Sequence, residues 1–269
     1  EVMPKVNSTI KKILKEKDAG ILTGTEAMNG ILVDLQKQVQ GELGGAALGS
    51  WDAYQLKRML DAIERQTADF QTKAKKEIGT SLDASWETGR ALIEESLKVA
   101  GIYTGFNIST SSLNALKDFT FHKIDGLADD AWYKIKGELT LGVLGGKTPA
   151  EVANAIGKNL TDKSIFSSIS ARAEAITKTE MGRVFSTATQ SRMAEAAQYV
   201  EGLEKQWIHA GHPKAARPTH VAAAGQHVPW NEPFLIGSIP MMFPRDPKAP
   251  IGEVINCGCD HVPWHESWQ

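Results

Sequence analysis

The chain has 269 residues, enough for two ordinary domains or for one domain with a long helical extension. Hydrophobic residues make up 42% and charged residues 23%, the balance of a folded globular protein, and the formal net charge of −2 argues against a strongly cationic nucleic-acid binder. No apolar run approaches the ~20 residues that span a bilayer, and residues 1–5 lack the layout of a signal peptide.

The first helices are predicted from apolar side chains at helical spacing among lysines. This spacing indicates a short amphipathic helix over residues 5–17, ended by Gly20, and a similar helix over residues 25–40. The glycine-rich residues 41–49 predict a loop, because glycine disfavours a continuing helix. We therefore expect short helices separated at glycines.

A longer apolar stripe predicts the next helix, with Ser50 as its N-cap and an interruption at Gly79. The pattern resumes at Ser81 and continues to Gly101, and the β-branched and polar residues 102–111 indicate a connector. A further helix or helix pair is indicated by a third set of apolar positions, Leu113, Leu116, Ile124, Leu127, Ile135 and Leu139.

The last helices precede an abrupt change in composition. The capping box at residues 148–151 predicts a short helix over 149–158, and the alanine-rich segment from Ser168 to Tyr199 predicts a long one. We predict a mainly α fold, with an elongated helical N-terminal region over residues 1–164 and a small α+β C-terminal domain over residues 165–269.

Two charged residues inside the last long helix have two possible roles. Glu180 and Arg183 stand three positions apart, so they can form an ion pair of small value on the helix surface. Alternatively, one of them points into the C-terminal domain and anchors its loops, because a buried charge must find a partner.

The tail is predicted to contain short strands and turns limited by proline. Prolines should confine the strands to sheet edges, since proline lacks the amide hydrogen that a central strand requires. The predicted elements are a strand at 207–209, a short helix at 220–224 capped by Thr219 and closed by Gly225, strands at 226–229 and 233–237, and an irregular loop at 240–250.

The tail also contains the residues that can bind a metal. Both cysteines and every histidine except His122 lie between Trp207 and His265. Two cysteines and two histidines provide the four ligands of a structural zinc ion, and the candidates are His212, His220, Cys257 and Cys259. Gly258 would permit the turn that points both sulfurs one way. The possible substitutes as ligands are His209, His227, His261 and His265.

Two other interpretations of these residues stay open. The cysteines, which stand too close in sequence for an unstrained disulfide, can pack as small buried hydrophobic residues while the histidines make ordinary hydrogen bonds. A catalytic Cys/His pair would need an activating base and an accessible thiol. The sequence contains no metalloprotease, serine-hydrolase or dinucleotide-binding motif, so we expect no enzymatic activity.

An ordered set of motifs in residues 165–263 resembles a known family. The set consists of Lys178-Thr179-Glu180, Trp207, Arg217-Pro218-Thr219-His220, Gly225-Gln226, Phe243-Pro244-x-Asp246-Pro247 and Ile255-Asn256-Cys257-Gly258-Cys259. In this order the motifs resemble the bacteriophage head-morphogenesis domain, also called the Mu F-like minor capsid protein. The family usually has an aspartate before its Arg-Pro-x-His motif, whereas this chain has His212 there with a shifted spacing.

The resemblance implies a structural protein of a tailed-phage virion, present in few copies inside the head near the portal. Such a protein assists procapsid assembly, DNA packaging or DNA delivery. Its expected partners are the portal, major capsid or scaffolding protein, and its expected locations are the host cytoplasm during assembly and then the virion.

Two competing functions stay open. The first is a metal-dependent hydrolase or nuclease, which would keep one ligand position of the metal open. The second is nonspecific contact with packaged DNA. From Lys205 onward the tail has five basic and five acidic residues, which argues against DNA contact there, although lysines of the N-terminal helices can still touch phosphates.

Overall fold

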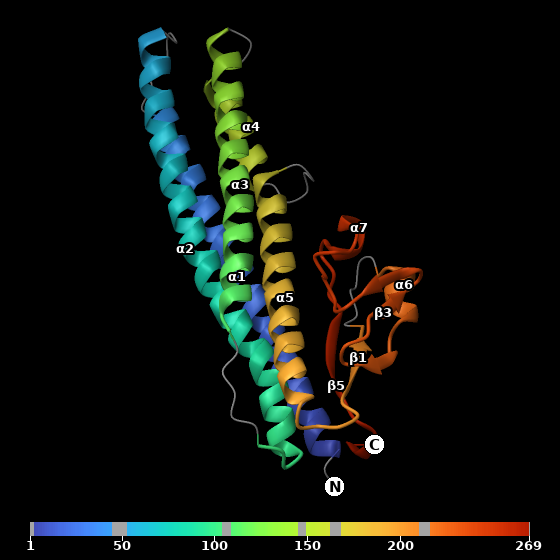
Figure 1. The fold of residues 1–269 in the computed structure, drawn as a ribbon. Coiled ribbons are helices and arrows are strands. Elements are labelled where there is room, and N and C mark those ends of the chain that lie inside the picture. The colour runs from blue at the N-terminus through green and yellow to red at the C-terminus, as the bar shows by residue number, and fades with distance from the viewer. Residues whose placement is uncertain are drawn as a thin grey trace. The chain divides into compact units, whose positions relative to one another are not determined.

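The computed structural model describes residues 3–44, 53–103, 109–144, 149–161, 168–209 and 216–268 (Figure 1). As predicted, the fold is mainly α, with a few short antiparallel strands near the C-terminus. The longer helices are α1 (Met3–Gly44), α2 (Ala53–Val99), α3 (Ser111–Val143), α4 (Pro149–Thr161) and α5 (Ile169–Ala196). The tail contains β1 (Glu204–Ile208), α6 (Pro218–Ala222), β2 (His227–Pro229), β3 (Phe234–Ile236), β4 (Ile239–Met241), α7 (Ile251–Val254), β5 (Asp260–Trp264) and the 3₁₀ helix η1 (Glu266–Trp268).

Single glycines do not divide the N-terminal helices, so the predicted breaks at Gly20 and Gly79 are wrong. α1 continues through Gly20, and α2 continues through Gly79. An interior glycine costs only about 1 kcal/mol relative to alanine, which the burial of the apolar stripe on either side outweighs. α1 extends to Gly44, while the rest of the predicted loop and the predicted cap Ser50 lie outside the described residues.

The predictions for the later helices are closer to the structure. α2 ends at Val99, and Gly101 follows in the left-handed conformation with φ of 82°. The apolar positions after the connector belong to one helix, α3, and not to a pair. None of the described helices combines the length and the apolar character that a membrane crossing requires.

Two compact units divide the chain, and each is built from segments that are distant in sequence. The first unit comprises Glu1–Leu22, Ser81–Lys117 and Lys178–Gln269, and the second comprises Thr23–Thr80 and Asp118–Thr177. Helices α1, α2, α3 and α5 therefore contribute residues to both units. The predicted domain boundary near residue 165 stays a prediction.

The second unit is held together by apolar helix faces and a few polar contacts. Ser170 Oγ donates a hydrogen bond of 2.9 Å to Asn29 Oδ1, and Lys75 forms an ion pair with Asp125. The side chains that form its interior include Met28, Leu32, Leu35, Ile63, Phe70, Ile124, Leu127, Ile135 and Ile156.

The first unit packs a three-stranded antiparallel sheet, in the order β2-β1-β5, together with segments of α1, α2 and α5. Val262 of β5 belongs to one apolar cluster with Val6, Ile10 and Phe185. Trp207 of β1 belongs to a second cluster with Phe234, Ile236, Met241, Cys257 and Cys259. The sheet therefore separates a helix-facing core from a smaller core that contains both cysteines.

Prolines occupy the sheet positions that the sequence predicts. Pro229 lies in β2 and Pro263 in β5, the two outer strands of the three-stranded sheet, and Pro240 lies in the two-stranded β3–β4 ladder. The prediction for Thr219 is wrong, because α6 begins after Arg217, has proline in its first turn and lacks a side-chain cap. Pro218 instead favours the helix start, since its fixed φ suits the first helical position.

Gly89 is expected to be essential for packing in the first unit. A Cβ atom there would lie 2.4 Å from the carbonyl oxygen of Phe185 and 2.9 Å from Cβ of Ala188. Replacing Gly89 with alanine should therefore lower the free energy of unfolding by about 2–3 kcal/mol, measured by urea denaturation. Gly20→Ala is the control, since nothing lies within 4 Å of its Cβ, and it should raise the stability by about 0.5–1 kcal/mol. Equal effects of the two substitutions would contradict this account.

Candidate metal site

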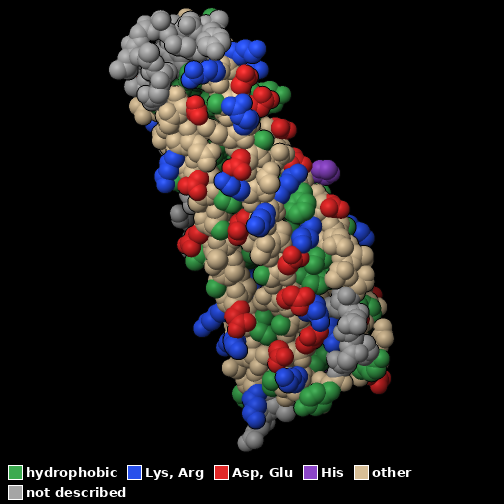
Figure 2. Space-filling view, turned by 90° about the vertical axis from the view of Figure 1, so that its left-hand side faces the viewer, with side chains coloured by type: hydrophobic (Ala, Val, Ile, Leu, Met, Phe, Trp, Pro, Cys, Tyr) green, Lys and Arg blue, Asp and Glu red, His purple; other side chains and the backbone are tan. Residues whose placement is uncertain are grey.

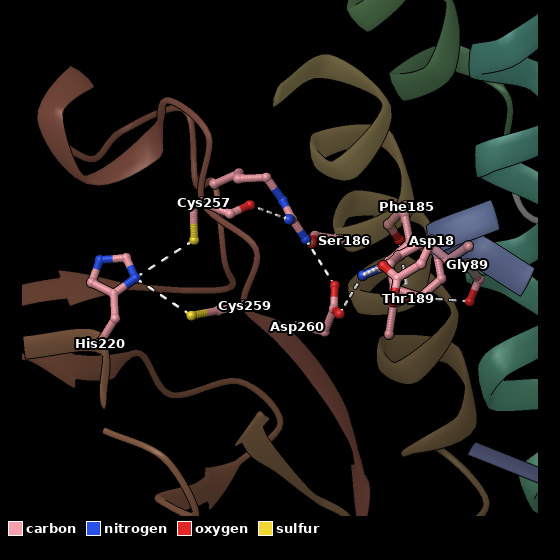
Figure 3. Close-up of polar contacts among 11 residues, drawn as sticks. Asp18, Gly89, Phe185, Ser186, Thr189, His220, Cys257, Cys259 and Asp260 are labelled. Carbon is pink, nitrogen blue, oxygen red and sulfur yellow. Dashed lines mark hydrogen bonds and ion pairs between the residues drawn. The ribbon is translucent and has the colours of Figure 1, made fainter. Parts of the chain in front are cut away.

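His220, Cys257 and Cys259 form a buried cluster in the first unit (Figure 3). Nδ1 of His220 lies 3.5 Å from Sγ of Cys257 and 3.5 Å from Sγ of Cys259. The three side-chain ligand atoms lie within 4.8 Å of one another, and both cysteines are free thiols. The sequence prediction that His220 meets both cysteines is thus confirmed, and the cluster could hold a metal ion.

The backbone around the cluster is fixed by contacts that begin in other elements. Arg217, next to α6, donates a hydrogen bond of 2.8 Å from Nη2 to the carbonyl oxygen of Ile255. Asn256 adopts a left-handed conformation with φ of 52°, and its amide donates to Oγ1 of Thr179 at 3.1 Å. Asparagine tolerates positive φ better than most residues, so Asn256 can supply this left-handed conformation beside the cysteines.

Glu253 fixes the orientation of the His220 ring. Its Oε2 atom lies 2.7 Å from Nε2 of His220. A proton on Nε2, shared with this carboxylate, leaves the lone pair of Nδ1 directed at the two sulfurs. Histidines that bind metals almost always donate the hydrogen of the second ring nitrogen to a carboxylate, a backbone carbonyl or water.

The pKa values of the two thiols are shifted in opposite directions from the ordinary value of cysteine. The hydrogen bond from Cys259 lowers the pKa of Cys257 to about 4, with further help from His220 and Arg245 against the effect of burial. The same hydrogen bond, with burial, raises the pKa of Cys259. Burial lowers the pKa of His220, but the hydrogen bond and the charge of Cys257 outweigh it, so this pKa is raised. The cluster thus favours one thiolate, the form of cysteine that binds metals.

The other predicted ligands do not join the described cluster. His212 lies outside the described residues. His227 pairs with Glu204, and His265 contacts Oγ of Ser267 and the carbonyl oxygen of Glu201. The two remaining substitutes, His209 and His261, are also not among the cluster residues.

Arg245 connects the cluster to the helical side of the sheet. Arg245 is buried, and its backbone has the left-handed conformation, with φ of 67°. Its Nη1 donates to the carbonyl oxygen of Cys257 at 2.7 Å, and its Nη2 donates to Oδ1 of Asp260 and Oγ of Ser186, both at 2.9 Å. Asp260 also forms an ion pair with Lys17 of α1. Cys257, Arg245, Asp260 and Lys17 therefore form a continuous buried chain of polar contacts.

Glu180 and Arg183 form a buried ion pair, with exposed fractions of 1% and 3%. Nε of Arg183 donates a hydrogen bond of 3.2 Å to the carbonyl oxygen of Arg245. The second of the two sequence interpretations is therefore confirmed, because this pair anchors a loop of the C-terminal region. A surface ion pair would have left both groups in water.

Sequence reasoning missed Arg245 and Lys17, and only one of them gives a signal. Lys17 follows Val6, Ile10 and Ile13 on the buried face of α1, so a charge interrupts an apolar stripe. A buried cation at such a position requires an anionic partner. Arg245 lies in a proline-rich loop, where no periodicity indicates which side chains turn inward.

His261 and Lys205 are buried in the first unit. Both ring nitrogens of His261 lack hydrogen-bond partners within the described part of the chain, and burial lowers its pKa to about 3. The ring is therefore neutral and packs against Phe243, with ring centroids 6.1 Å apart. Nζ of Lys205 donates to the carbonyl oxygen of Met242 at 2.6 Å and lies 5.2 Å from the ring centroid of Phe234.

Lys205 is expected to make stability depend on pH in the alkaline range. Burial lowers its pKa to about 8, against the opposing effects of Asp246 and Glu232. Between about pH 8 and pH 10.4 the unfolded chain then binds more protons than the folded chain, so the free energy of unfolding should rise with pH by about 1–3 kcal/mol. Denaturation of the natural chain and of Lys205→Met across this range measures the effect. The difference between their curves should change with pH, whereas parallel curves would exclude a depressed pKa.

Comparisons of this chain with protein-family models, with curated proteins and with solved structures found no match.

Proposed function

We propose that this chain is a structural minor head protein of a tailed bacteriophage. It would lie inside the head near the portal and assist procapsid assembly, DNA packaging or DNA delivery. Its helices would dock on the portal, major capsid or scaffolding protein, while the compact C-terminal region supports the assembly without turning over a substrate.

The observation that carries this proposal is that the motifs of the family resemblance contact one another. Oγ1 of Thr179 accepts a hydrogen bond from the amide of Asn256, and Arg217 donates one to the carbonyl oxygen of Ile255. The amide of Trp207 donates to the carbonyl oxygen of Gln226 at 2.8 Å. Asp246 accepts hydrogen bonds from the amides of Met242 and Lys248 and so closes the proline-rich loop. Motifs spread over some eighty residues thus form one packed structure around His220, Cys257 and Cys259, which supports the proposal.

We also propose that the metal is a structural zinc ion. Tetrahedral zinc, with bonds of about 2.0 Å to nitrogen and about 2.3 Å to sulfur, separates nitrogen and sulfur ligands by about 3.5 Å. Nδ1 of His220 has this separation from each cysteine sulfur. Soft thiolates with imidazole also favour zinc over magnesium or calcium. His212 stays the predicted fourth ligand, which would close the site.

Glu253 should tune the affinity for zinc through His220. Glu253→Gln removes the charge that holds the Nε2 proton, and loss of such a partner typically weakens metal binding about 10- to 100-fold. Competition titration with a chromophoric chelator measures the change. Glu204→Gln is the matched control, because Glu204 pairs with His227 outside the cluster. If both variants bound zinc as the natural chain does, Glu253 would have no orienting role.

The alternative function is a zinc-dependent hydrolase or nuclease. The described residues provide three ligands, which is also the number in catalytic zinc sites that keep a fourth position for water. An apolar hollow of about 190 Å³ in the first unit is lined by residues of α1, β1, β5 and η1, and none of the three ligands lines it. Zinc-dependent cleavage of DNA or RNA by the purified chain, lost in Cys259→Ser, would favour this alternative.

Nonspecific DNA contact has less support. Figure 2 shows lysine and arginine side chains interspersed with aspartate and glutamate over the described residues of the visible face, without a broad area of one sign. A surface that tracks phosphates usually concentrates positive charge.

The location of the chain in assembled particles tests the proposed function. Particles purified from producing cells should contain the chain in few copies, measured by quantitative mass spectrometry. Protease added to intact particles should leave the chain uncut, and protease added to opened particles should degrade it. Its absence from heads and procapsids would overturn the proposal.

A further inference from the structure

We propose that metal binding at His220, Cys257 and Cys259 strengthens the attachment of residues 3–22 of α1 to the rest of the first unit. This inference depends on the zinc proposal and extends it, because it gives the site a role beyond its own loops. The site would control whether the N-terminal segment of the chain is held or released.

The first step of the coupling runs through the backbone of the ligand loop. Asp260 directly follows the ligand Cys259, so a metal that fixes the sulfur also fixes the start of β5. The carbonyl oxygen of the other ligand, Cys257, accepts the hydrogen bond from Nη1 of Arg245. Cys259 is covalently bonded to Asp260, and Cys257 is hydrogen-bonded to Arg245. Both cysteines are therefore linked directly to the ion pair between Arg245 and Asp260.

The second step is the rigid placement of Arg245. A Cβ on Gly182 of α5 would lie 2.8 Å from the guanidinium, so the arginine lies directly against the helix backbone. Its Nη2 is shared by Asp260 and Ser186. With a left-handed backbone and no free space, Arg245 has little freedom to follow a displaced Asp260.

The third step connects Asp260 to α1. The side chains of Lys17 and Asp260 are 3% and 1% exposed, and they form an ion pair. Nζ of Lys17 also lies 5.6 Å from the ring centroid of Phe185 and 3.0 Å from Oδ1 of Asp18, a residue that is largely exposed. If the ligand loop loosens and Asp260 moves, Lys17 loses its buried anionic partner, and a buried charge without a partner favours release of the segment.

Thermodynamic linkage makes the coupling reciprocal. If metal binding raises the equilibrium constant for attachment of residues 3–22 by some factor, attachment of these residues must raise the affinity for the metal by the same factor. Lys17 contacts no ligand of the site but should therefore influence zinc binding.

Hydrogen exchange of the full chain, followed by mass spectrometry with zinc or with excess EDTA, tests the inference. Zinc should slow exchange in residues 3–22 about fivefold or more and in residues 251–264 as well, while residues 25–44 of the same helix stay unchanged. If zinc binds and protects 251–264 but leaves 3–22 unchanged, the inference is overturned and the zinc proposal stands. If no zinc is retained, the zinc proposal fails, and this inference fails with it.

Substitutions of Lys17 test the route of the coupling. Lys17→Met should remove the zinc-dependent slowing in residues 3–22 and weaken zinc binding about fivefold or more. Lys17→Arg keeps the charge and should preserve part of both effects, and Lys12→Met, on an exposed lysine of α1, should preserve both fully. Equal zinc affinity and equal exchange in Lys17→Met and Lys12→Met would overturn the route through Asp260.

Discussion

Cys257→Ser is expected to abolish zinc retention and to loosen the region that contains α6, α7 and β5, while the helices of the second unit stay folded. Serine oxygen is a poor zinc ligand, so the substitution removes one of the few ligands of the site. Structural zinc contributes about 10–16 kcal/mol in zinc-finger peptides. Because the apolar cluster around Trp207 also supports this region, we expect a smaller loss of roughly 3 kcal/mol or more. Elemental analysis gives the zinc content, and hydrogen exchange in residues 251–264 reports the loosening.

His227→Gln is the matched control for this prediction. His227 lies in the same region, stacks on Trp264 and is not a member of the cluster, so its loss should leave one zinc per chain. Adding EDTA to the natural chain should reproduce the effect of Cys257→Ser, and adding it to Cys257→Ser should change nothing further. A natural chain that contains no metal and melts identically with and without EDTA would exclude a structural zinc.

Asp260→Asn is expected to be the most destabilising single substitution away from the ligands. It leaves both Lys17 and Arg245 without their buried carboxylate, and removing one partner of a buried ion pair typically costs about 3–5 kcal/mol. Burial alone would raise the pKa of Asp260, but Lys17 and Arg245 together lower it, so the aspartate is held in its charged form. Urea denaturation of the natural chain and the variant at neutral pH measures the difference.

Asp83→Asn provides the comparison for Asp260→Asn. Asp83 pairs with Lys117 at 2.7 Å in the same unit, but half of its side chain is exposed. Exposed pairs contribute no more than about 1 kcal/mol. A loss in Asp260→Asn as small as that in Asp83→Asn would mean that the buried chain of contacts does not stabilise the first unit.

The helices are predictable from the sequence because their apolar stripes are local and periodic. The same local reasoning fails at Gly20 and Gly79, since it counts the cost of a glycine but not the burial on either side of it. The prolines predict the sheet edges well, because the loss of a backbone donor has the same consequence in any fold.

The candidate metal site is only partly predictable. Residue type indicates His220 and the two cysteines, since few other side chains bind zinc. Nothing local indicates that Glu253 would orient the histidine or that Arg245 would turn inward, because these contacts depend on how separate loops pack. The pairing of Lys17 with Asp260, 243 residues apart, is equally invisible to periodicity.

That pairing also has a consequence for how the protein is made. At about 5–20 residues per second, a ribosome needs roughly 10 to 50 seconds to translate the 243 residues between Lys17 and Asp260. During that interval the apolar face of α1 lacks Val262 and Trp268, which complete its cluster in the folded chain. The first unit can be completed only after synthesis reaches β5, so residues 3–22 of α1 must wait for their last partners while the chain is being made.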